Sequence, residues 1–235
     1  MLSTVCLPTY NERDNVEPMV HALGRHGVRV LVIDDNSPDG TGEIADRLAA
    51  ELDYVGVLHR ERKEGLGPAY IAGFHAALED GAERVLEMDC DFSHDPADVP
   101  RLIAATEDAD LALGSRYVDG GAIASWGPGR RFVSAGGSLY ARLLLNTGIR
   151  DLTGGFKCYR RRVLETIDLD AVSSRGYAFQ IETTYRTLRS GFRVVEVPIT
   201  FVDRAVGGSK MSRDIVLEAI WKVPALRGAA LLGRL

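Results

Sequence analysis

Short runs of β-branched and aliphatic residues alternate with segments of helical spacing through the first half of the chain. Five such runs have the composition of buried strands, and polar residues follow several of them: 3–8, 28–34, 54–60, 84–91 and 109–117. The segments between the runs place apolar residues three and four positions apart, which predicts helices at 15–27, 42–52, 68–81 and 96–107. Alternation of this kind predicts an α/β fold with a mostly parallel central sheet flanked by helices.

The second half of the chain is less regular. Residues 119–129 are Gly-rich and too long for a plain connector, so they predict a functional loop. We expect helices over 131–145 and 176–191, and a short strand followed by a helix within 154–167. A last strand over 192–204 contains Pro198, which predicts an edge strand or a bulge.

The chain shows no internal repeat and no clear linker, so we expect one large domain over residues 1–213. The tail, 214–235, is apolar but is interrupted by Pro224, Arg227 and Arg234. It has the character of an amphipathic segment that could lie on a membrane or dock a partner helix. Packing against its own domain is the alternative.

Composition narrows the function classes. The net charge of −5 over 235 residues argues against a dedicated nucleic-acid-binding protein, which would usually be basic. The three cysteines, Cys6, Cys90 and Cys158, are far apart in the sequence, which fits a reducing compartment and predicts no zinc site. We find no leader-like N-terminus and no apolar run long enough to span a bilayer, so we expect a cytoplasmic chain.

Two aspartates, Asp89 and Asp91, close the fourth apolar run. They point the same way if the strand continues that far, and at ~4 Å their repulsion would be about 4 kcal/mol at an effective dielectric of 20. A divalent cation turns that repulsion into attraction. A solvated turn that caps the next helix is the alternative, and spacing alone leaves both open. His94 could ligate a metal or be a structural histidine of the loop or helix cap. Asp95, which directly precedes Pro96, predicts an N-cap for the next helix.

Polar residues also follow the first, second and fifth strands, in the segments PTYNE, DDNSPDGT and GSRY. Ligands of open parallel sheets bind outside the carboxyl ends of the strands, so these segments predict one site, although DDNSPDGT is equally typical of a turn. Gly65 and Gly67 match a dinucleotide fingerprint only in part, because Tyr70 occupies its last position. No P-loop motif occurs either.

Several basic residues fall in the second half of this acidic chain: Arg116, Arg130, Arg131, Arg204 and Lys210. Their position near strand ends and in loops indicates phosphate recognition, with an ordinary solvated surface as the alternative. Arg204 and Lys210 flank the pair Gly207–Gly208, a composition that suits a loop closing over a phosphate.

The order of these motifs resembles a known family. Dolichyl-phosphate (polyprenol monophosphate) mannosyltransferases, which are family-2 glycosyltransferases with the GT-A fold, are similar to this chain over about residues 3–213. The segments that carry the resemblance are LPTYNE, VIDDNSPDGT, GLGPAYIAGF, MDCDFSHDP, GSRY, DLTGGFKCYRR, GYAFQIE and VPITFVDRAVGGSK.

The resemblance implies inverting transfer of mannose from GDP-mannose to a polyprenyl phosphate. It implies a nucleoside pocket formed by Pro8, Tyr10, Glu12, Ile33 and Asp35. It also implies that the DxD segment engages Mg²⁺ or Mn²⁺, and through it the diphosphate, with Asp89, Cys90 and Asp91. Ser93 stands where many members carry a metal-associated Gln, and we expect it to be the third metal ligand.

Other positions follow from the same resemblance. Arg116 and Arg130 are similar to residues near the acceptor phosphate, and we expect them to be catalytic together with Asp89 and Asp91. Arg204 and Lys210 match a loop that closes on the donor phosphates, and Arg116 joins this nucleotide-sugar site. Gln180 and Glu182 match a sugar-side motif.

The acceptor phosphate is already an anion, so this chemistry needs no strong general base. The alternatives are a polyprenyl-phosphate glycosyltransferase that uses UDP-glucose or another nucleotide sugar, and a non-catalytic sugar-nucleotide-binding subunit. Because the acceptor is a lipid, we expect peripheral association with the cytoplasmic face of a membrane. Some relatives carry C-terminal membrane helices, so a membrane-anchoring partner subunit or fused domain is a further expected partner.

Overall fold

The computed structural model describes residues 1–124, 127–174, 176–203, 213–233 and 235. Within these ranges it describes all side chains except those of residues 128, 130, 132 and 213–219. The predicted closing loop with Arg204 and Lys210 therefore lies outside the described residues.

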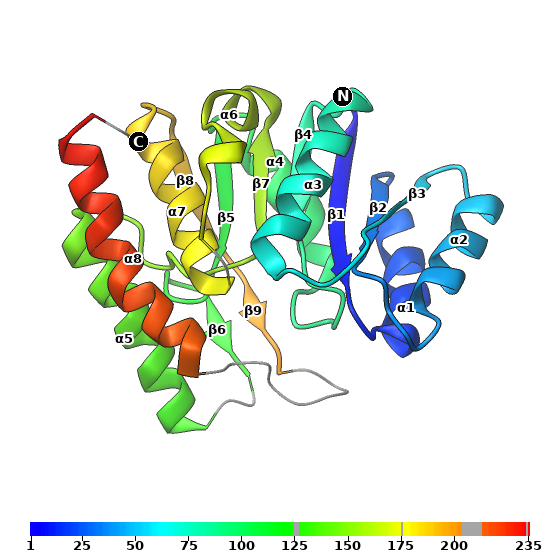
Figure 1. Cartoon of the computed structure of the whole chain (residues 1–235), viewed down its shortest axis with the longest axis horizontal. Helices are drawn as coiled ribbons and strands as arrows, with labels where there is room; N and C mark the ends of the chain where they lie inside the picture. The colour runs from blue at the N-terminus through cyan, green and yellow to red at the C-terminus, as the bar shows by residue number, and fades with distance from the viewer. Residues whose placement is uncertain (125–126, 175, 204–212, 234) are drawn as a thin grey trace.

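A seven-stranded sheet of order β3-β2-β1-β4-β7-β5-β8 runs through the middle of the molecule (Figure 1). All neighbouring strands are parallel except β7, which is antiparallel to both β4 and β5. The strands are β1 Ser3–Thr9, β2 Arg29–Asp34, β3 Val55–His59, β4 Arg84–Glu87, β5 Leu111–Ser115, β7 Lys157–Arg160 and β8 Val194–Pro198. A separate short pair joins β6, Ala122–Ile123, to β9, Thr200–Phe201.

Strand alternation gives each face of the sheet its own core. Along β1, Val5 and Leu7 pack in one cluster, and Cys6 packs in the cluster on the other face. The first cluster lies under α1 Arg13–Gly24, α2 Thr41–Glu51 and α4 Val99–Ala105. The second lies under α3 Leu66–Glu79, α6 Arg161–Thr166 and α7 Gly176–Arg189.

Two further helices form an outer layer on one side of the molecule: α5 Pro128–Leu145 and α8 Arg213–Leu231. They lie beside α7, at the left of Figure 1. Val223, Leu226 and Ala230 of α8 are buried in a third cluster with residues of α5 and α7. This part of the tail therefore packs on its own protein, while the division into segments at residue 213 stays a prediction.

Three details differ from the expectation. Strand β4 ends at Glu87 rather than at residue 91, because its ladders with β1 and β7 both end there. Helix α3 begins at Leu66, two residues before Pro68. The segment after Pro96 starts as a 3₁₀ turn, Pro96–Asp98, before α4 begins. The edge position, one of the two alternatives expected for the Pro198 strand, is confirmed, because among the described residues β8 pairs only with β5.

Gly67 is required by a close approach between α3 and the segment that precedes α7. A Cβ there would lie 2.6 Å from the carbonyl oxygen of Ser174 and 3.0 Å from the ring of Phe179. We expect Gly67→Ala to lower the free energy of unfolding by about 1–3 kcal/mol in a urea titration. Gly136→Ala on α5 is the matched control, because no atom of the described residues lies within 4 Å of its Cβ position. The free energy of unfolding of Gly136→Ala should rise by up to ~1 kcal/mol, because Ala has the higher helix propensity. An equal decrease in the free energy of unfolding of both variants would contradict the packing argument.

Candidate active site

The carboxyl ends of β1, β2 and β4 meet at the lower edge of the sheet in Figure 1. The loops that leave β1 and β2 are bonded to each other at this edge. Thr9 Oγ1 donates to a carboxylate oxygen of Asp34 at 3.2 Å, and the amide of Asp35 donates to the carbonyl of Thr9 at 3.1 Å. The predicted polar ends of the first two strands are therefore neighbours in space.

Charged groups hold the side chains around the β1 and β2 ends. Asp35 accepts from Arg60 Nη1 at 2.5 Å, and burial raises the pKa of its carboxyl although Arg60 opposes that rise. The Lys63 amine lies 4.0 Å from the centre of the Tyr10 ring. Glu12 accepts from Asn15 Nδ2 at 2.9 Å. These contacts place the side chains of Tyr10, Glu12 and Asp35 at the two strand ends.

Two other residues of the predicted nucleoside pocket belong to the strands themselves. Pro8 is partly buried within β1. The side chain of Ile33 is fully buried in the cluster under α3, and its Cδ1 atom lies 2.3 Å from where a Cβ on Gly73 would be. Ile33 therefore contributes to the core, and a nucleoside contact from either residue stays a prediction.

The segment Asp89–His94 is a compact turn rather than a continuation of β4. The amide of Asp89 donates to His94 Nδ1 at 3.3 Å, and the amide of Ser93 donates to Asp91 Oδ1 at 3.0 Å. Phe92 has a φ of 59°, in the left-handed region that bulky residues rarely adopt. The turn, and not strand alternation, therefore sets the directions of the two aspartates. Asp95 accepts from the amide of Ala97 at 2.9 Å, which confirms the predicted N-cap.

His94 is a buried neutral residue that fixes this turn. Its ring stacks on Phe156 at 5.0 Å and meets Phe201 edge-on at 5.4 Å. Burial lowers the pKa of His94 to about 4, so at neutral pH its Nδ1 can accept from the Asp89 amide. Of the two roles open from the sequence, the structure shows the loop role.

The donors in the turn suit a hard divalent cation. Ser93 is buried, and its Oγ atom has no hydrogen-bond partner among the described residues. Asp91 is also buried, and Cys90 packs in the core as expected. In the described part of the chain no group of three or more His, Cys, Asp and Glu side chains is arranged so that it could hold a metal ion by itself. A metal here would therefore need the serine hydroxyl and substrate oxygens as ligands in addition to the carboxylates. Mg²⁺ is commonly bound in this way, by one or two carboxylates together with phosphate oxygens of the substrate.

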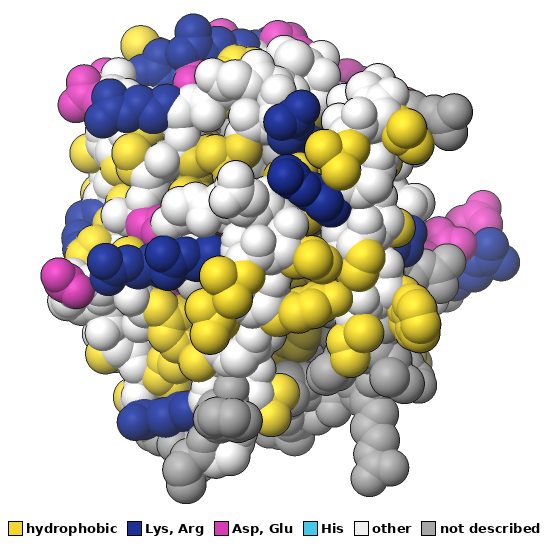
Figure 2. All heavy atoms as spheres, turned by 90° about the vertical axis from the view of Figure 1, so that its left-hand side faces the viewer, with side chains coloured by type: hydrophobic (Ala, Val, Ile, Leu, Met, Phe, Trp, Pro, Cys, Tyr) yellow, Lys and Arg dark blue, Asp and Glu magenta, His cyan; other side chains and the backbone are white. Residues whose placement is uncertain are grey.

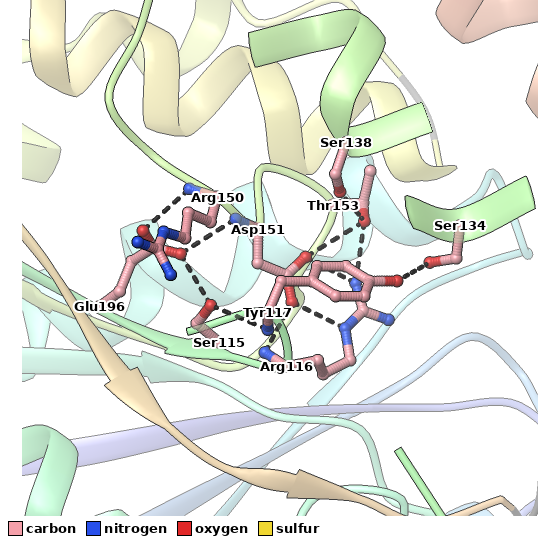
Figure 3. Close-up of polar contacts among 9 residues, drawn as sticks. All are labelled: Ser115, Arg116, Tyr117, Ser134, Ser138, Arg150, Asp151, Thr153 and Glu196. Carbon is pink, nitrogen blue, oxygen red and sulfur yellow. Dashed lines mark hydrogen bonds and ion pairs between the residues drawn. The ribbon is translucent and has the colours of Figure 1, made fainter. Parts of the chain in front are cut away.

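Arg116 follows β5 and is buried in an ion pair with Asp151 (Figure 3). Arg116 Nε and Nη2 donate to the two carboxylate oxygens, each at 2.7 Å, and Nη2 also donates to Thr153 Oγ1 at 2.8 Å. Burial alone would lower the pKa of Arg116, but the Asp151 carboxylate outweighs it and the net pKa is raised. Bidentate geometry of this kind fixes the plane of the guanidinium.

The other predicted cationic residues are less completely placed. Arg130 lies on α5, but its side chain is outside the described part of the chain, and Arg204 and Lys210 are wholly outside it. Whether they approach Arg116 stays a prediction. Arg131 donates to the carbonyl of Ile123.

A buried polar cluster lies beneath the Asp89–His94 turn. Tyr159 donates to the carboxylate of Glu87 at 2.8 Å, and Lys157 Nζ donates to the carbonyl of Gln180 at 2.9 Å. Burial raises the pKa of Glu87, and the charge of Lys157 opposes that rise. The side chain of Gln180 is buried beside Glu87, and like Tyr159 it opposes the rise in the pKa of that carboxyl. Glu182 is bonded to Arg186 at 2.9 Å and to Ser174.

Sequence reasoning missed three charged residues of this region: Asp151, Lys157 and Glu196. Asp151 opens a motif quoted above for the resemblance, but nothing in its neighbourhood identified Arg116 as its partner. Lys157 looked like an ordinary charged residue of a short strand, yet it is fully buried. Only the antiparallel course of β7 brings its first residue to the edge where β4 ends.

Comparisons with known proteins agree with this fold and identify a family. The profile of the family described as Glycosyl transferase family 2 matches residues 4–168. The chain belongs to glycosyl transferase family 2.

Two curated relatives are similar over almost the whole chain. One, "Polyprenol monophosphomannose synthase" of Mycolicibacterium smegmatis, is 52% identical over 93% of this chain and 84% of that protein. Another, "Undecaprenyl-phosphate mannosyltransferase" of Micrococcus luteus, is 51% identical over 92% of this chain and 90% of that protein. The chain is therefore a glycosyltransferase.

Solved structures confirm the GT-A fold. The mannosyltransferase PcManGT from Pyrobaculum calidifontis, in complex with GDP-Man and Mn²⁺, has a TM-score of 0.56 at 15% identity, covering 98% of this chain and 74% of that one. S. aureus TarS 1-349 has a TM-score of 0.65 at 19% identity, covering 99% and 66%. At these identities the likeness concerns the fold alone.

The buried amine of Lys157 predicts a pH dependence of stability. Burial lowers its pKa from the ordinary 10.5 to about 8, so between pH 8 and 10.5 the unfolded chain binds more protons at this residue than the folded protein. Stability owed to this group therefore rises with pH across that window. We expect the free energy of unfolding of the wild type, minus that of Lys157→Met, to increase from pH 8 to pH 10.5 in urea titrations. A constant or falling difference would contradict the lowered pKa.

Proposed function

We propose that the chain transfers mannose from GDP-mannose to a polyprenyl phosphate, with inversion at the sugar carbon. The observation that carries the proposal is the 52% identity to a polyprenol monophosphomannose synthase over 93% of the chain. The geometry of the site supports it, because acidic and hydroxyl oxygens at the β4 end and a fixed arginine at the β5 end suit two phosphate-bearing substrates.

Asp89, Asp91 and Ser93 would hold a divalent cation, Mg²⁺ or Mn²⁺. When bound, such a metal neutralises the donor diphosphate and stabilises the charge that develops on the leaving group. The buried hydroxyl of Ser93, which has no hydrogen-bond partner among the described residues, and the buried carboxylate of Asp91 support this assignment. The left-handed backbone at Phe92 and the bond from the Asp89 amide to His94 keep this turn in one shape.

The donor nucleoside would bind at the ends of β1 and β2. Pro8, Tyr10, Glu12 and Asp35 form that edge, with Ile33 below it in the core. Arg60 keeps Asp35 in place through their contact at 2.5 Å, so the Asp35 carboxylate is preorganised to accept a hydrogen bond. Cys90 would contribute its backbone, because its side chain is buried on the core side.

An oxygen of the acceptor phosphate would form the new bond to the sugar carbon. The bond from that carbon to the β-phosphate oxygen breaks, and its electron pair leaves with GDP. The acceptor oxygen is already anionic, so the residues need only hold it in line, a task we assign to Arg116 and Arg130. Neutral, buried His94 is not required as a base. Arg204 and Lys210 would close over the donor phosphates.

A transfer assay tests the donor and the metal together. We expect the purified chain to form lipid-linked sugar from GDP-mannose and a short polyprenyl phosphate, but not from UDP-glucose, and to lose activity with EDTA. Asp91→Ala should lower kcat by about 100-fold or more, because it removes charge stabilisation at the diphosphate. Asp95→Ala, which removes only the cap four residues away, should keep its turnover and lose ~1 kcal/mol of stability.

Two outcomes of that assay would overturn the proposal. Product formed only from a UDP-sugar would show a different donor. Binding of GDP-mannose without turnover, unaffected by Asp89→Ala and Asp91→Ala, would show a non-catalytic subunit.

We also propose that the protein meets its lipid substrate by lying on the membrane surface through α5 and α8. No helix in the described ranges is long and apolar enough to cross a bilayer. Figure 2 shows hydrophobic side chains gathered on the face that α5 and α8 share, with Lys and Arg side chains around them. Leu143 is 71% exposed on α5, and Trp221 is 77% exposed on α8.

The charges of this face favour anionic lipids. Neither residues 128–150 nor residues 219–235 contain an acidic residue, although the chain as a whole has a net charge of −5. The described basic side chains are Arg131, Arg142 and Arg150 in the first segment and Lys222 and Arg227 in the second. Exposed Leu and Trp with surrounding basic residues is the pattern of a helix that binds in the membrane interface.

A sedimentation experiment tests the membrane face. Leu143→Glu should lower the fraction of protein that pellets with vesicles of mixed neutral and anionic lipids by about tenfold, because it places a charge in the apolar face. Ala50→Glu is the matched control, since Ala50 is exposed on α2, at the opposite end of the molecule in Figure 1. Equal pelleting of the two variants would exclude this face as the docking surface.

A further inference from the structure

The carboxylate of Asp151 is the best-held group in the region of Arg116. It is fully buried, and besides the two guanidinium bonds it accepts from the backbone amide of Arg116 at 3.0 Å. Thr153 completes the arrangement, because its hydroxyl accepts from Arg116 Nη2 at 2.8 Å. Three donor contacts of one guanidinium are thus fixed by two residues of a single turn.

This turn is itself fixed to the sheet. Glu196 on β8 accepts from the backbone amides of Arg150 and Asp151 at 2.8 and 2.9 Å, and from Ser115 Oγ at 2.7 Å (Figure 3). Ser115 is the last residue of β5 and directly precedes Arg116. The carboxylate of Glu196 therefore ties the turn to the strand end that carries the arginine.

The same turn also contacts the helix that we place on the membrane. Ser138 Oγ on α5 lies 3.0 Å from Thr153 Oγ1, and Tyr117 donates to Ser134 Oγ at 2.8 Å, one helical turn away (Figure 3). Ser134 and Ser138 thus present one side of α5 to the two segments that flank Arg116. A displacement of α5 would be felt at Thr153 and, through it, at the guanidinium.

We propose that Asp151 and Thr153 are positioning residues for the acceptor phosphate, which hold Arg116 in one orientation and tie that orientation to α5. The inference rests on the proposed function, because it takes Arg116 to contact the phosphate. A lipid phosphate enters from the membrane that α5 faces. A guanidinium whose orientation is fixed through contacts with α5 therefore keeps a constant position relative to the bilayer. Misplacing a substrate by 1 Å can cost on the order of 100-fold in rate, which makes such a fixed orientation worthwhile.

Three variants test this proposal. Asp151→Asn keeps the shape and removes the charge. It should lower kcat and raise KM for a short polyprenyl phosphate by about tenfold, a larger change than in KM for GDP-mannose. Thr153→Val removes only the hydroxyl and should raise the acceptor KM by about three- to tenfold, the weight of one hydrogen bond. Thr153→Ser, which keeps the hydroxyl, should restore the wild-type acceptor KM.

Matched controls separate positioning from stability. Asp110, at the opposite end of β5, also accepts from an arginine side chain and from a backbone amide. Asp110→Asn should lower the melting temperature without changing the ratio of the two KM values. Thr187→Val removes a buried hydroxyl that, within the described part of the chain, bonds only to a helix carbonyl. It is the matched control for Thr153→Val.

The results distinguish failure of the inference from failure of the proposed function. Binding of the short polyprenyl phosphate, measured by titration calorimetry, reports on the acceptor site without turnover. If the wild type binds it but transfers no sugar, the proposed function fails, while a weaker affinity in Thr153→Val still supports the inference. If Asp151→Asn does not fold, Thr153→Val and Thr153→Ser decide the matter. Equal acceptor KM and affinity in Thr153→Val and Thr187→Val would overturn the inference, and so would a wild type that does not bind the lipid.

Discussion

Burial of charge at the carboxyl edge of the sheet is the constraint on which the rest of this structure depends. A protein of net charge −5 gathers Asp35, Asp91 and Asp151 at this edge, and each is held by contacts specific to it. Arg60 holds the first, a backbone amide of its own turn contacts the second, and Arg116 holds the third. Breaking a buried pair of this kind costs several kcal/mol, because it leaves one charge unpaired. The fold therefore keeps these side chains in place whether or not a substrate is bound.

The sheet and most of its helices could be predicted from the sequence, because apolar periodicity reports directly on which face of an element is buried. Strand β4 shows the limit of that signal. Met88 and Cys90 are buried as a strand would bury them, yet the ladder ends at Glu87 and the chain turns. Periodicity cannot distinguish a buried strand from a buried turn, since both place apolar residues in the core.

The charged contacts could be predicted less well, because they depend on which segments meet in space. Asp89 and Asp91 were found from their spacing, and the strand ends from the fold. Asp151 and Glu196 were not, since their partners are 35 and 45 or more residues away in the sequence. Arg204 and Lys210 were found from the composition of their loop and from the resemblance to a family, and they lie outside the described residues.

The position of β7 has a consequence for how such an enzyme can evolve. This antiparallel strand separates β1, β2 and β4, which carry the proposed nucleotide and metal residues, from β5 and the helices α5 and α8. Mutations on one side of β7 that leave crossing contacts intact, such as that of His94 with Phe201, need not disturb the other side. A lineage can then keep its donor chemistry while it adapts to a new acceptor, or the reverse.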